Sequence, residues 1–357
     1  MRVGILTFPG SQSYGASLQM MGLYRTLQDL DCTVEVINYM NPFMKGRKHV
    51  PVKTNQLRKI IGRIKGVPKV MRFKEFEKCI MMYPDHQIND HEQLSNICKR
   101  YAYVICGSDQ VWNPLITGSD YSYFFDFIDD SAKKIAYAPS FGVTSLEDKD
   151  YIYIKHALER FTHISVREES GKKLVKELTG VDCPVVIDPS MLRTREEWKC
   201  LEKKVKQLPE KYIMYFMLNN VDYAKRFAEK LSVQTGYPIV NICGIIDKNR
   251  FTGKNMSLVG PDEWLYTMDN ASYVITDSFH GAVFSILFEK ENFISLASVT
   301  NSRLKTLLDT VKLKNRILDS HSVIEQYDKI DYTPVREILA KKRNEGISFL
   351  KESMNFR

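Results

Sequence analysis

Short apolar segments alternate with helical patterns along almost the whole chain, and this alternation constrains the fold more than any other feature. Many of the apolar segments lack the polar alternation of a half-exposed strand, which is typical of parallel strands covered on both faces. The strand candidates are Arg2–Phe8, Thr33–Tyr39, Tyr101–Gly107, Lys134–Ser140, His163–Arg167, Val185–Ile187, Tyr212–Leu218, Pro238–Cys243, Met256–Val259, Tyr273–Thr276 and Asn292–Leu296. We therefore predict an α/β fold made of doubly wound parallel sheets.

The length of 357 residues and a gap between two series of strands predict two domains. In that gap, Thr194 and Glu197 have the spacing of a helix capping box. We predict an N-terminal domain over residues 1–190 and a C-terminal domain over 191–357, both Rossmann-like and facing a cleft. A last predicted helix, Val335–Met354, follows the second series, and we expect it to pack back on the N-terminal domain.

One segment supplies the net charge of +8. Between Asn41 and Lys74 the chain carries eleven Lys and Arg and no Asp or Glu, so the rest has a net charge of 8 − 11 = −3. Apolar residues from Ile60 to Met71 have loose helical spacing opposite a basic face. This basic insertion, 41–74, is typical of a solvated helix and loop or of a contact with an anionic membrane. We do not expect nucleic acid as a partner, because the segment has few aromatic residues and no recognised binding module.

Cysteine spacing and hydropathy bear on the cellular compartment. The seven cysteines form no CxxC pair and the histidines no HExxH pattern, so we expect reduced core thiols, no metal and no cofactor. No apolar run reaches the roughly 18 residues that a membrane span needs. The first residues do not resemble a secretion signal, so we expect a cytoplasmic protein, peripheral at the inner membrane face if the basic insertion binds lipid.

Two turns in the N-terminal half are candidates for ligand binding, because doubly wound sheets bind ligands where strands lead into helices. The first turn contains Ser13, Tyr14 and Gly15, at the start of a predicted helix. The second contains Ser108, Asp109, Gln110 and Asn113 around Trp112. Amide and carboxylate side chains beside an aromatic face suit a sugar. Ordinary turn and helix-cap roles are the alternative for both turns.

Arg167 ends a predicted strand at a third turn. Its guanidinium suits a carboxylate or a phosphate, which it can bind through two parallel hydrogen bonds. The alternative is a salt bridge with the glutamates that follow it.

His280 lies in the first turn of another predicted helix, directly after the helix-capping residues Asp277 and Ser278. Free backbone donors at such a position attract anions and tune an imidazole's affinity for protons. Gly281 would allow a ligand to approach the backbone closely. The alternative for His280 is a buried structural role.

Arg303 and Lys305 open a later helix soon after the strand Asn292–Leu296. Their place in the chain predicts that they border the same cleft as His280. The alternative is that both are solvated charges.

Five segments together resemble the polysaccharide pyruvyl transferase family. They are SYGASLQ (13–19), GSDQVWNP (107–114), SVREES (165–170) with VIDPSML (186–192), TDSFHGAVFSILF (276–288) and NSRLKTLL (301–308). The segments run through most of the chain in the family's order. Ser13 stands where the family usually has asparagine.

The resemblance implies an architecture like that of GT-B glycosyltransferases and an enzyme of cell-surface or capsular polysaccharide synthesis. Its reaction would move the pyruvyl group of phosphoenolpyruvate, as co-substrate, onto two hydroxyls of a saccharide acceptor, lipid-linked or free, and release phosphate. On this basis His280 is the expected general acid, Asp109 the expected base, and Arg167 and Arg303 stabilise the anionic donor. Asp277, Ser278, Gly281 and Lys305 complete the expected donor site.

Two other functions are compatible with these patterns. A nucleotide-sugar glycosyltransferase of the same architecture would need a nucleobase pocket and a ribose-binding carboxylate, which the sequence does not single out. A non-catalytic carbohydrate- or lipid-binding protein would use the basic insertion as its anchor.

Overall fold

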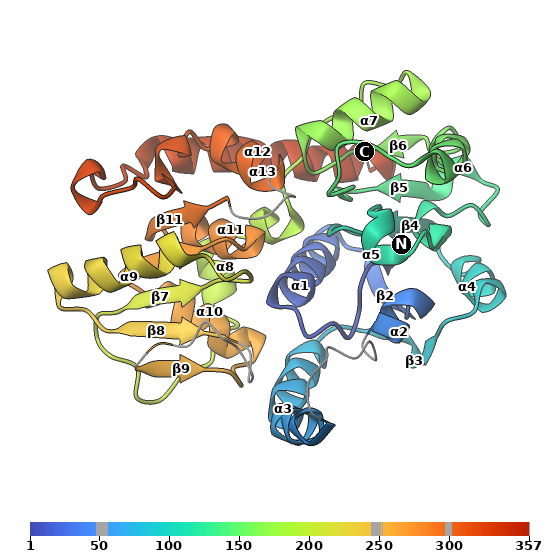
Figure 1. Ribbon diagram of the computed structural model, residues 1–357. Helices are drawn as coiled ribbons and strands as arrows, with labels where there is room; N and C mark the ends of the chain where they lie inside the picture. The colour runs from blue at the N-terminus through green and yellow to red at the C-terminus, as the bar shows by residue number, and fades with distance from the viewer. Residues whose placement is uncertain (48–55, 244–250, 252, 297–301, 357) are drawn as a thin grey trace. The chain divides into compact units, whose positions relative to one another are not determined.

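The computed structural model describes residues 1–47, 56–243, 251, 253–296 and 302–356, and within these ranges the side chains of 45–47, 56–65 and 132 are not described. The chain divides into two units (Figure 1). Unit 1 comprises Met1–Val52, Glu77–Arg193 and Ala340–Arg357, whereas unit 2 comprises Lys53–Phe76 and Thr194–Leu339.

Unit 1 contains a six-stranded sheet with the order β3-β2-β1-β4-β5-β6. The strands are β1 (Arg2–Leu6), β2 (Thr33–Tyr39), β3 (Met82–Ile88), β4 (Tyr103–Cys106), β5 (Lys134–Ala136) and β6 (His163–Ile164). All neighbouring strands are parallel. This is the strand order of a Rossmann sheet, whose ligands bind beyond the carboxyl ends of the central pair, here β1 and β4.

Unit 2 repeats this topology with the order β12-β11-β10-β7-β8-β9. Its strands are β7 (Ile213–Phe216), β8 (Ile239–Ile242), β9 (Lys254–Met256), β10 (Tyr273–Thr276), β11 (Glu291–Ser295) and β12 (Ile317–Leu318). These strands are also parallel throughout. Two doubly wound sheets are therefore confirmed, and β7 and β10 form the central pair of the second.

The helices of unit 1 connect its strands. They are α1 (Tyr14–Asp29), α2 (Pro42–Arg47), α4 (His91–Cys98), α5 (Pro114–Thr117), α6 (Asp148–Leu158) and α7 (Glu169–Thr179), with short 3-10 turns η1 (Tyr121–Phe124), η2 (Ser131–Lys133) and η3 (Pro189–Leu192). Helix α1 approaches η3 so closely that a Cβ at Gly22 would lie 2.4 Å from the carbonyl oxygen of Pro189.

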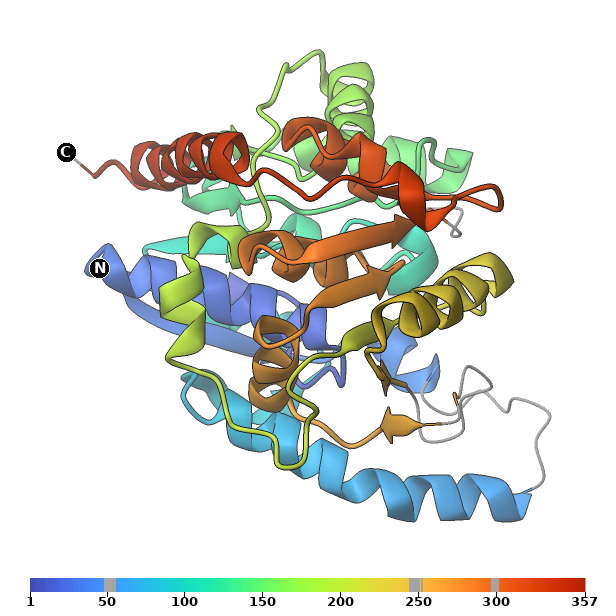
Figure 2. The same ribbon diagram turned by 90° about the vertical axis from the view of Figure 1, so that its left-hand side faces the viewer.

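The helices of unit 2 are α8 (Arg195–Lys199), α9 (Asp222–Thr235), α10 (Pro261–Asp269), α11 (Phe279–Leu287) and α12 (Ser302–Thr310), with 3-10 turns η4 (Lys314–Arg316) and η5 (Ile324–Gln326). The predicted capping box at Thr194 and Glu197 is present at the start of α8. Figure 2 shows α9 and α10 on opposite faces of the sheet. Aromatic side chains hold α10 to α11, where the rings of Trp264 and Phe284 meet edge-on at 5.4 Å.

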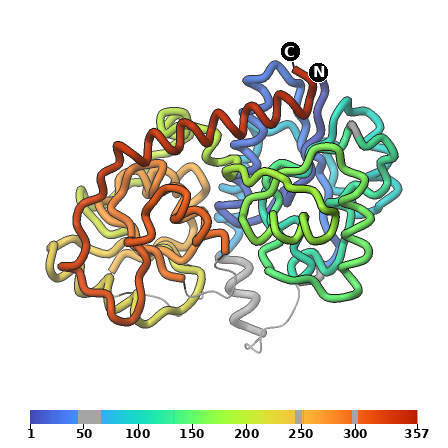
Figure 3. The backbone as a smooth tube through the Cα atoms, turned by 90° about the horizontal axis from the view of Figure 1, so that it is seen from above, coloured from blue at the N-terminus to red at the C-terminus, as the bar shows by residue number. Residues whose placement is uncertain are grey.

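Two long helices contain residues of both units. Helix α3 (Gln56–Glu77) contains the second half of the basic insertion, and in unit 2 Arg72 donates hydrogen bonds to Leu258 O and Glu263 Oε2, each at 2.8 Å. Helix α13 (Thr333–Ser353) continues from Ala340 in unit 1, where Arg343 Nε donates to Met191 O at 3.1 Å. Figure 3 shows both chain termini at one edge of unit 1. Within the described ranges, no helix has the length and apolar character needed to cross a membrane.

The strand predictions were incomplete at the sheet edges. β3 was missed because its sequence, MYPDHQI, is mostly polar and exposed and contains a proline, all of which an edge strand tolerates. β12 was missed because it has only two residues. The predicted strand Val185–Ile187 forms a single bridge, between Val185 and Val166.

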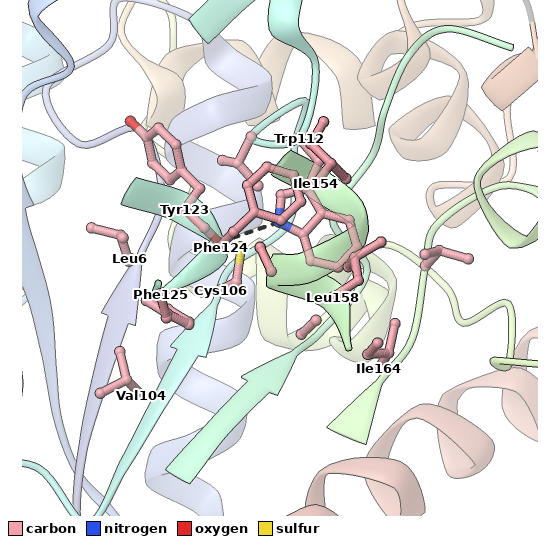
Figure 4. Close-up of a cluster of buried hydrophobic side chains, with 14 of the residues drawn as sticks. Leu6, Val104, Cys106, Trp112, Tyr123, Phe124, Phe125, Ile154, Leu158 and Ile164 are labelled. Carbon is pink, nitrogen blue, oxygen red and sulfur yellow. Dashed lines mark hydrogen bonds between the residues drawn. The ribbon is translucent and has the colours of Figure 1, made fainter. Parts of the chain in front are cut away.

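The core of unit 1 is rich in aromatic side chains and includes a buried cysteine, Cys106 (Figure 4). All seven cysteines are free. Five of them are buried as expected, but Cys79 and Cys200 are exposed, so the prediction of core thiols is wrong at those two positions.

Candidate functional site

The turn after β10 is fixed by hydrogen bonds before α11 begins. Thr276 Oγ1 donates to Phe216 O at 2.6 Å and accepts from Ser278 N at 3.0 Å. Ser278 is the N-cap of α11, and its hydroxyl accepts from Gly281 N at 3.3 Å. These contacts tie the two central strands of unit 2 together and hold the first turn of α11 at their carboxyl ends.

His280 lies in that first turn and is 7% exposed. Its ring meets the ring of Phe279 edge-on, with centroids 5.2 Å apart. The guanidinium carbon of Arg303, on α12, lies 5.7 Å from the centroid of the same Phe279 ring. Phe279 thus contacts both an imidazole and a guanidinium beside the positive end of the α11 dipole, an arrangement that favours an anion.

Asp277 is engaged by the neighbouring turn. Its carboxylate accepts hydrogen bonds from Leu218 N at 2.6 Å, from Asn219 N at 3.0 Å and from Asn219 Nδ2 at 2.8 Å. It therefore braces the segment that follows β7. A carboxylate used in this way offers nothing to an anionic donor, so the structure favours a scaffold role for Asp277.

Gly281 is required by the protein's own packing. A Cβ at this position would lie 2.3 Å from Thr276 Oγ1. The glycine is thus explained by the close packing of α11 on β10, and not by the approach of a ligand that we expected. Lys305, the last predicted donor residue, is exposed on α12.

In unit 1, the first predicted acceptor turn caps α1. The exposed Ser13 is the N-cap, and its hydroxyl accepts from Ala16 N at 3.5 Å. Tyr14 and Gly15 are buried at the start of the helix. Only Ser13 among these three presents its side chain to solvent.

The turn after β4 is held mainly by internal hydrogen bonds. Asn113 donates to Gln110 Oε1 at 2.9 Å, and its own amide oxygen caps α5 by accepting from Leu115 N. The buried Ser108 hydroxyl donates to Ala138 O at 2.8 Å. Asp109 has a left-handed backbone (φ 77°), and its side chain is 16% exposed. Asp109 and Gln110 are the partly exposed members of this cluster.

Trp112 does not offer a face to a sugar. It is 1% exposed, and its ring stacks on Phe124 with centroids 5.0 Å apart and contacts Phe141 at 5.3 Å. Its Nε1 donates to Tyr123 O at 3.2 Å, the dashed line in Figure 4. The predicted aromatic platform is wrong, because the local sequence did not reveal that the ring belongs to the core.

Arg167 is enclosed by carboxylates. Its side chain is 1% exposed and lies 2.8 Å from Asp188, 3.7 Å from Asp109 and 4.0 Å from Glu168. Burial by itself lowers the pKa of Arg167, but the three carboxylates outweigh burial and raise it. The structure therefore favours a salt-bridge role over direct binding of an anionic donor, but the nearest partner is Asp188 and not the glutamates that follow Arg167.

Sequence reasoning missed the partners that organise this network. Ser190 Oγ donates to Asp188 Oδ1 at 2.6 Å, and Ser140 Oγ donates to Glu168 Oε1 at 2.8 Å. The signal was present for Asp188 and Ser190, since both lie in the DPS sequence that follows an apolar segment. Among the described residues, no group of three or more His, Cys, Asp or Glu side chains is placed to hold a metal ion.

Comparison with known proteins decides the family. The sequence model of polysaccharide pyruvyl transferases matches residues 14–296, which include the turn after β4 and the first turn of α11. The chain belongs to the polysaccharide pyruvyl transferase family. Its members are transferases, so the protein is an enzyme of this class. Arg303 and Lys305 lie beyond the matched residues. No curated protein matches the chain significantly.

Solved structures with the GT-B fold resemble the protein across its whole length. UDP-GlcNAc 2-epimerase from Neisseria meningitidis, solved bound to UDP-GlcNAc, is 10% identical, with a TM-score of 0.55 and coverage of 100% of both chains. UDP-GlcNAc 2-epimerase from Methanocaldococcus jannaschii is 13% identical, with a TM-score of 0.54 and coverage of 96% of this chain and 92% of that chain. Identities this low establish the fold alone, which is the predicted GT-B-like pair of doubly wound units.

Proposed function

We propose that this family member transfers the pyruvyl group of phosphoenolpyruvate to two hydroxyls of one sugar in a cell-surface polysaccharide precursor. The observation that carries the proposal is the grouping of His280, Phe279 and Arg303 at the N-terminus of α11. Phosphoenolpyruvate is small and carries two anionic groups, so it is bound best by cations and backbone N–H groups with little apolar surface.

The reaction forms two C–O bonds at C2 of the donor and breaks the bond between C2 and the phosphate oxygen. Of the two hydroxyl protons, one ends on the methylene carbon, which becomes a methyl group, and the other leaves with phosphate. His280 is the proposed acid for the methylene carbon, and Arg303 stabilises the charge on the donor and on departing phosphate.

Asp109 is the proposed base for the attacking hydroxyl. Its side chain is partly exposed and its Oδ1 lies 3.7 Å from a guanidinium nitrogen of Arg167. Arg167 is therefore proposed as a positioning residue, which holds Asp109 in place without touching the donor.

The second half of the basic insertion supports a proposed contact with anionic lipid. On α3, Val67 is 51% exposed and Met71 is 64% exposed, one turn apart on the same face. Two exposed apolar side chains in a segment with eleven cations and no acidic residue fit a bilayer of negative surface charge. Such a contact would bring the enzyme to a lipid-linked acceptor at the inner membrane face.

Thermal unfolding of the full chain with phosphoenolpyruvate, UDP or GDP tests the donor. Ligand at 100 times its dissociation constant stabilises the folded state by about 2.7 kcal/mol. We expect this shift with phosphoenolpyruvate, its loss in His280→Asn and Arg303→Gln, and its retention in His321→Asn, a control at an exposed histidine of the same unit. A shift with UDP or GDP alone would replace this proposal with glycosyl transfer.

A further inference from the structure

A recess in unit 1 opens where β1 and β2 end and has no role in the donor chemistry above. Its walls include Phe8 and Ser11 from the segment after β1, Tyr39, Met40 and Met44 at and after the end of β2, and Tyr123 from η1. It encloses a cavity volume of about 30 Å³, or about 290 Å³ with its open mouth. The recess thus lies at the carboxyl edge of the sheet, the edge at which doubly wound folds bind ligands.

Two polar side chains around the recess, those of Tyr39 and Asn41, are already paired within the protein. Tyr39 donates to Asp120 Oδ2 at 2.6 Å and also contacts Ser122 Oγ at 3.1 Å. Asn41 donates to Thr117 O and accepts from Met44 N. Among the residues that the structure describes, those lining the recess include no Lys, Arg or His.

The hydroxyl of Tyr123 is a further polar group at the recess. Its residue is fully buried, and this oxygen has no hydrogen-bond partner among the described residues. The ring is held edge-on by Phe8 at 5.3 Å and by Tyr39 at 6.0 Å. Figure 4 shows the hydroxyl pointing away from Cys106 and Trp112. A buried hydroxyl without a partner destabilises the folded state, and a ligand that accepts its hydrogen bond would recover that loss.

We propose that this recess binds the acetyl group of an acetylated sugar, with the acetyl methyl against Met40, Met44 and Phe8 and the acetyl carbonyl accepting from Tyr123. The enclosed volume exceeds the 10–15 Å³ or so that one water needs, but it is too small for a sugar ring. An acetyl group has one polar atom, its carbonyl oxygen, which can accept the hydrogen bond of the Tyr123 hydroxyl.

Three lining residues of the recess, Phe8, Pro9 and Ser11, come shortly before the predicted acceptor residue Ser13 in the chain. The identification of this sugar as the acceptor rests on the proposed function, whereas binding of the acetyl group does not. The acetyl group can be linked to the sugar through nitrogen or through oxygen. Both linkages present the same methyl and carbonyl to the recess, so the proposal covers both.

Saturation-transfer NMR with the full chain tests the proposal, using N-acetylglucosamine, 6-O-acetylglucose and glucose as probes. We expect the strongest saturation at the acetyl methyl of at least one acetylated probe and none for glucose. Binding of N-acetylglucosamine would identify a nitrogen linkage, and binding of 6-O-acetylglucose would identify an oxygen linkage. Equal saturation of glucose, or no preference for the methyl, would overturn the proposal and leave a recess filled only by water.

Variants locate the binding. Tyr123→Phe removes a hydroxyl that has no protein partner, so it should fold normally yet bind the acetylated probe about 2- to 12-fold more weakly, the range for one hydrogen bond. Tyr121→Phe is the matched control, because it loses a hydrogen bond to Asp150 (2.7 Å) outside the recess and should bind normally. Met44→Phe narrows the recess and should abolish the methyl signal. Unchanged binding in both recess variants would overturn the assignment.

Donor binding is measured separately, by the thermal shift with phosphoenolpyruvate. Acetyl binding without a phosphoenolpyruvate shift would uphold the recess and reject pyruvyl transfer. A phosphoenolpyruvate shift without acetyl binding would support the proposed donor and reject the recess as an acetyl site.

Discussion

The guanidinium of Arg167 lies 2.8 Å from the carboxylate of Asp188, and both side chains are at most 1% exposed. This pair links the turn after β6 to η3. Because a buried charge that loses its partner is costly, we expect the pair to contribute strongly to the stability of unit 1. We therefore expect Arg167 to serve the stability of unit 1, in addition to its proposed positioning of Asp109.

Removing the guanidinium of Arg167 should therefore lower the stability of the folded protein. Arg167→Met leaves Asp188, Asp109 and Glu168 near one another without a cation, and we expect the free energy of unfolding to fall by about 3–5 kcal/mol. Urea unfolding measures the change. The control Arg336→Met breaks an exposed pair with Glu289 and should cost about 0–1 kcal/mol. Equal effects of the two variants would refute a structural role for Arg167.

Loss of the proposed acid should affect turnover. We expect His280→Asn to slow phosphate release from phosphoenolpyruvate by about 10²- to 10⁴-fold, the usual contribution of general acid catalysis. His321→Asn should react at the wild-type rate, because His321 is exposed and lies outside the proposed donor site. Full turnover in His280→Asn would reject the acid assignment.

A methyl group at Gly281 should destabilise unit 2. In Gly281→Ala the new Cβ would lie 2.3 Å from Thr276 Oγ1, an atom held by Phe216 O, and such overpacking costs about 1–3 kcal/mol. Thermal unfolding measures the loss. In a double-mutant cycle with Thr276→Ala, the two costs should be less than additive, since the second change removes the clashing hydroxyl. Simple additivity would contradict the packing explanation.

Stability should depend on pH through Glu202. Burial, with Asp269 as the next cause, raises the pKa of Glu202 to about 7 from its ordinary value of 4.5. The folded state thus holds a proton that the unfolded state has released. Its stabilisation is full below about pH 4.5 and is lost as the pH rises through 7.

Glu202→Gln removes this dependence. We expect the variant to gain stability relative to wild type between pH 5 and pH 8, measured by urea unfolding at both values. Glu210→Gln, at an exposed position, should follow the wild-type curve. Parallel curves for wild type and Glu202→Gln would show that the carboxyl titrates normally.

The proposed lipid contact of α3 is tested by sedimentation with phosphatidylglycerol vesicles. A Val67→Asp, Met71→Asp double variant places two negative charges on the exposed face and should abolish binding. Val233→Asp, at a residue 86% exposed on α9, should leave it intact. Binding that is lost equally in both variants, or unaffected by either, would reject α3 as the contact.

The sheets and the main helices were predictable because their signal is local. Continuous apolar strands and capped helices such as α8 are recognised from neighbouring residues. The edge strand β3 was not recognised, because its residues are mostly polar. The site was predictable only in part. His280 was correctly placed in the first turn of a helix, but Trp112 was mistaken for a ligand platform, because its cover, Phe124 and Phe141, depends on packing between turns.

By itself, the sequence determined the doubly wound fold, the membership of the pyruvyl transferase family and the turns that carry polar side chains. Only the tertiary structure decided which of those side chains face solvent. Arg167 meets Asp188 across 21 positions, and Asp277 meets Leu218 across 59. Such pairs form because parallel sheets bring distant turns to one edge, and a buried charge or hydrogen-bonding group must find its partner there.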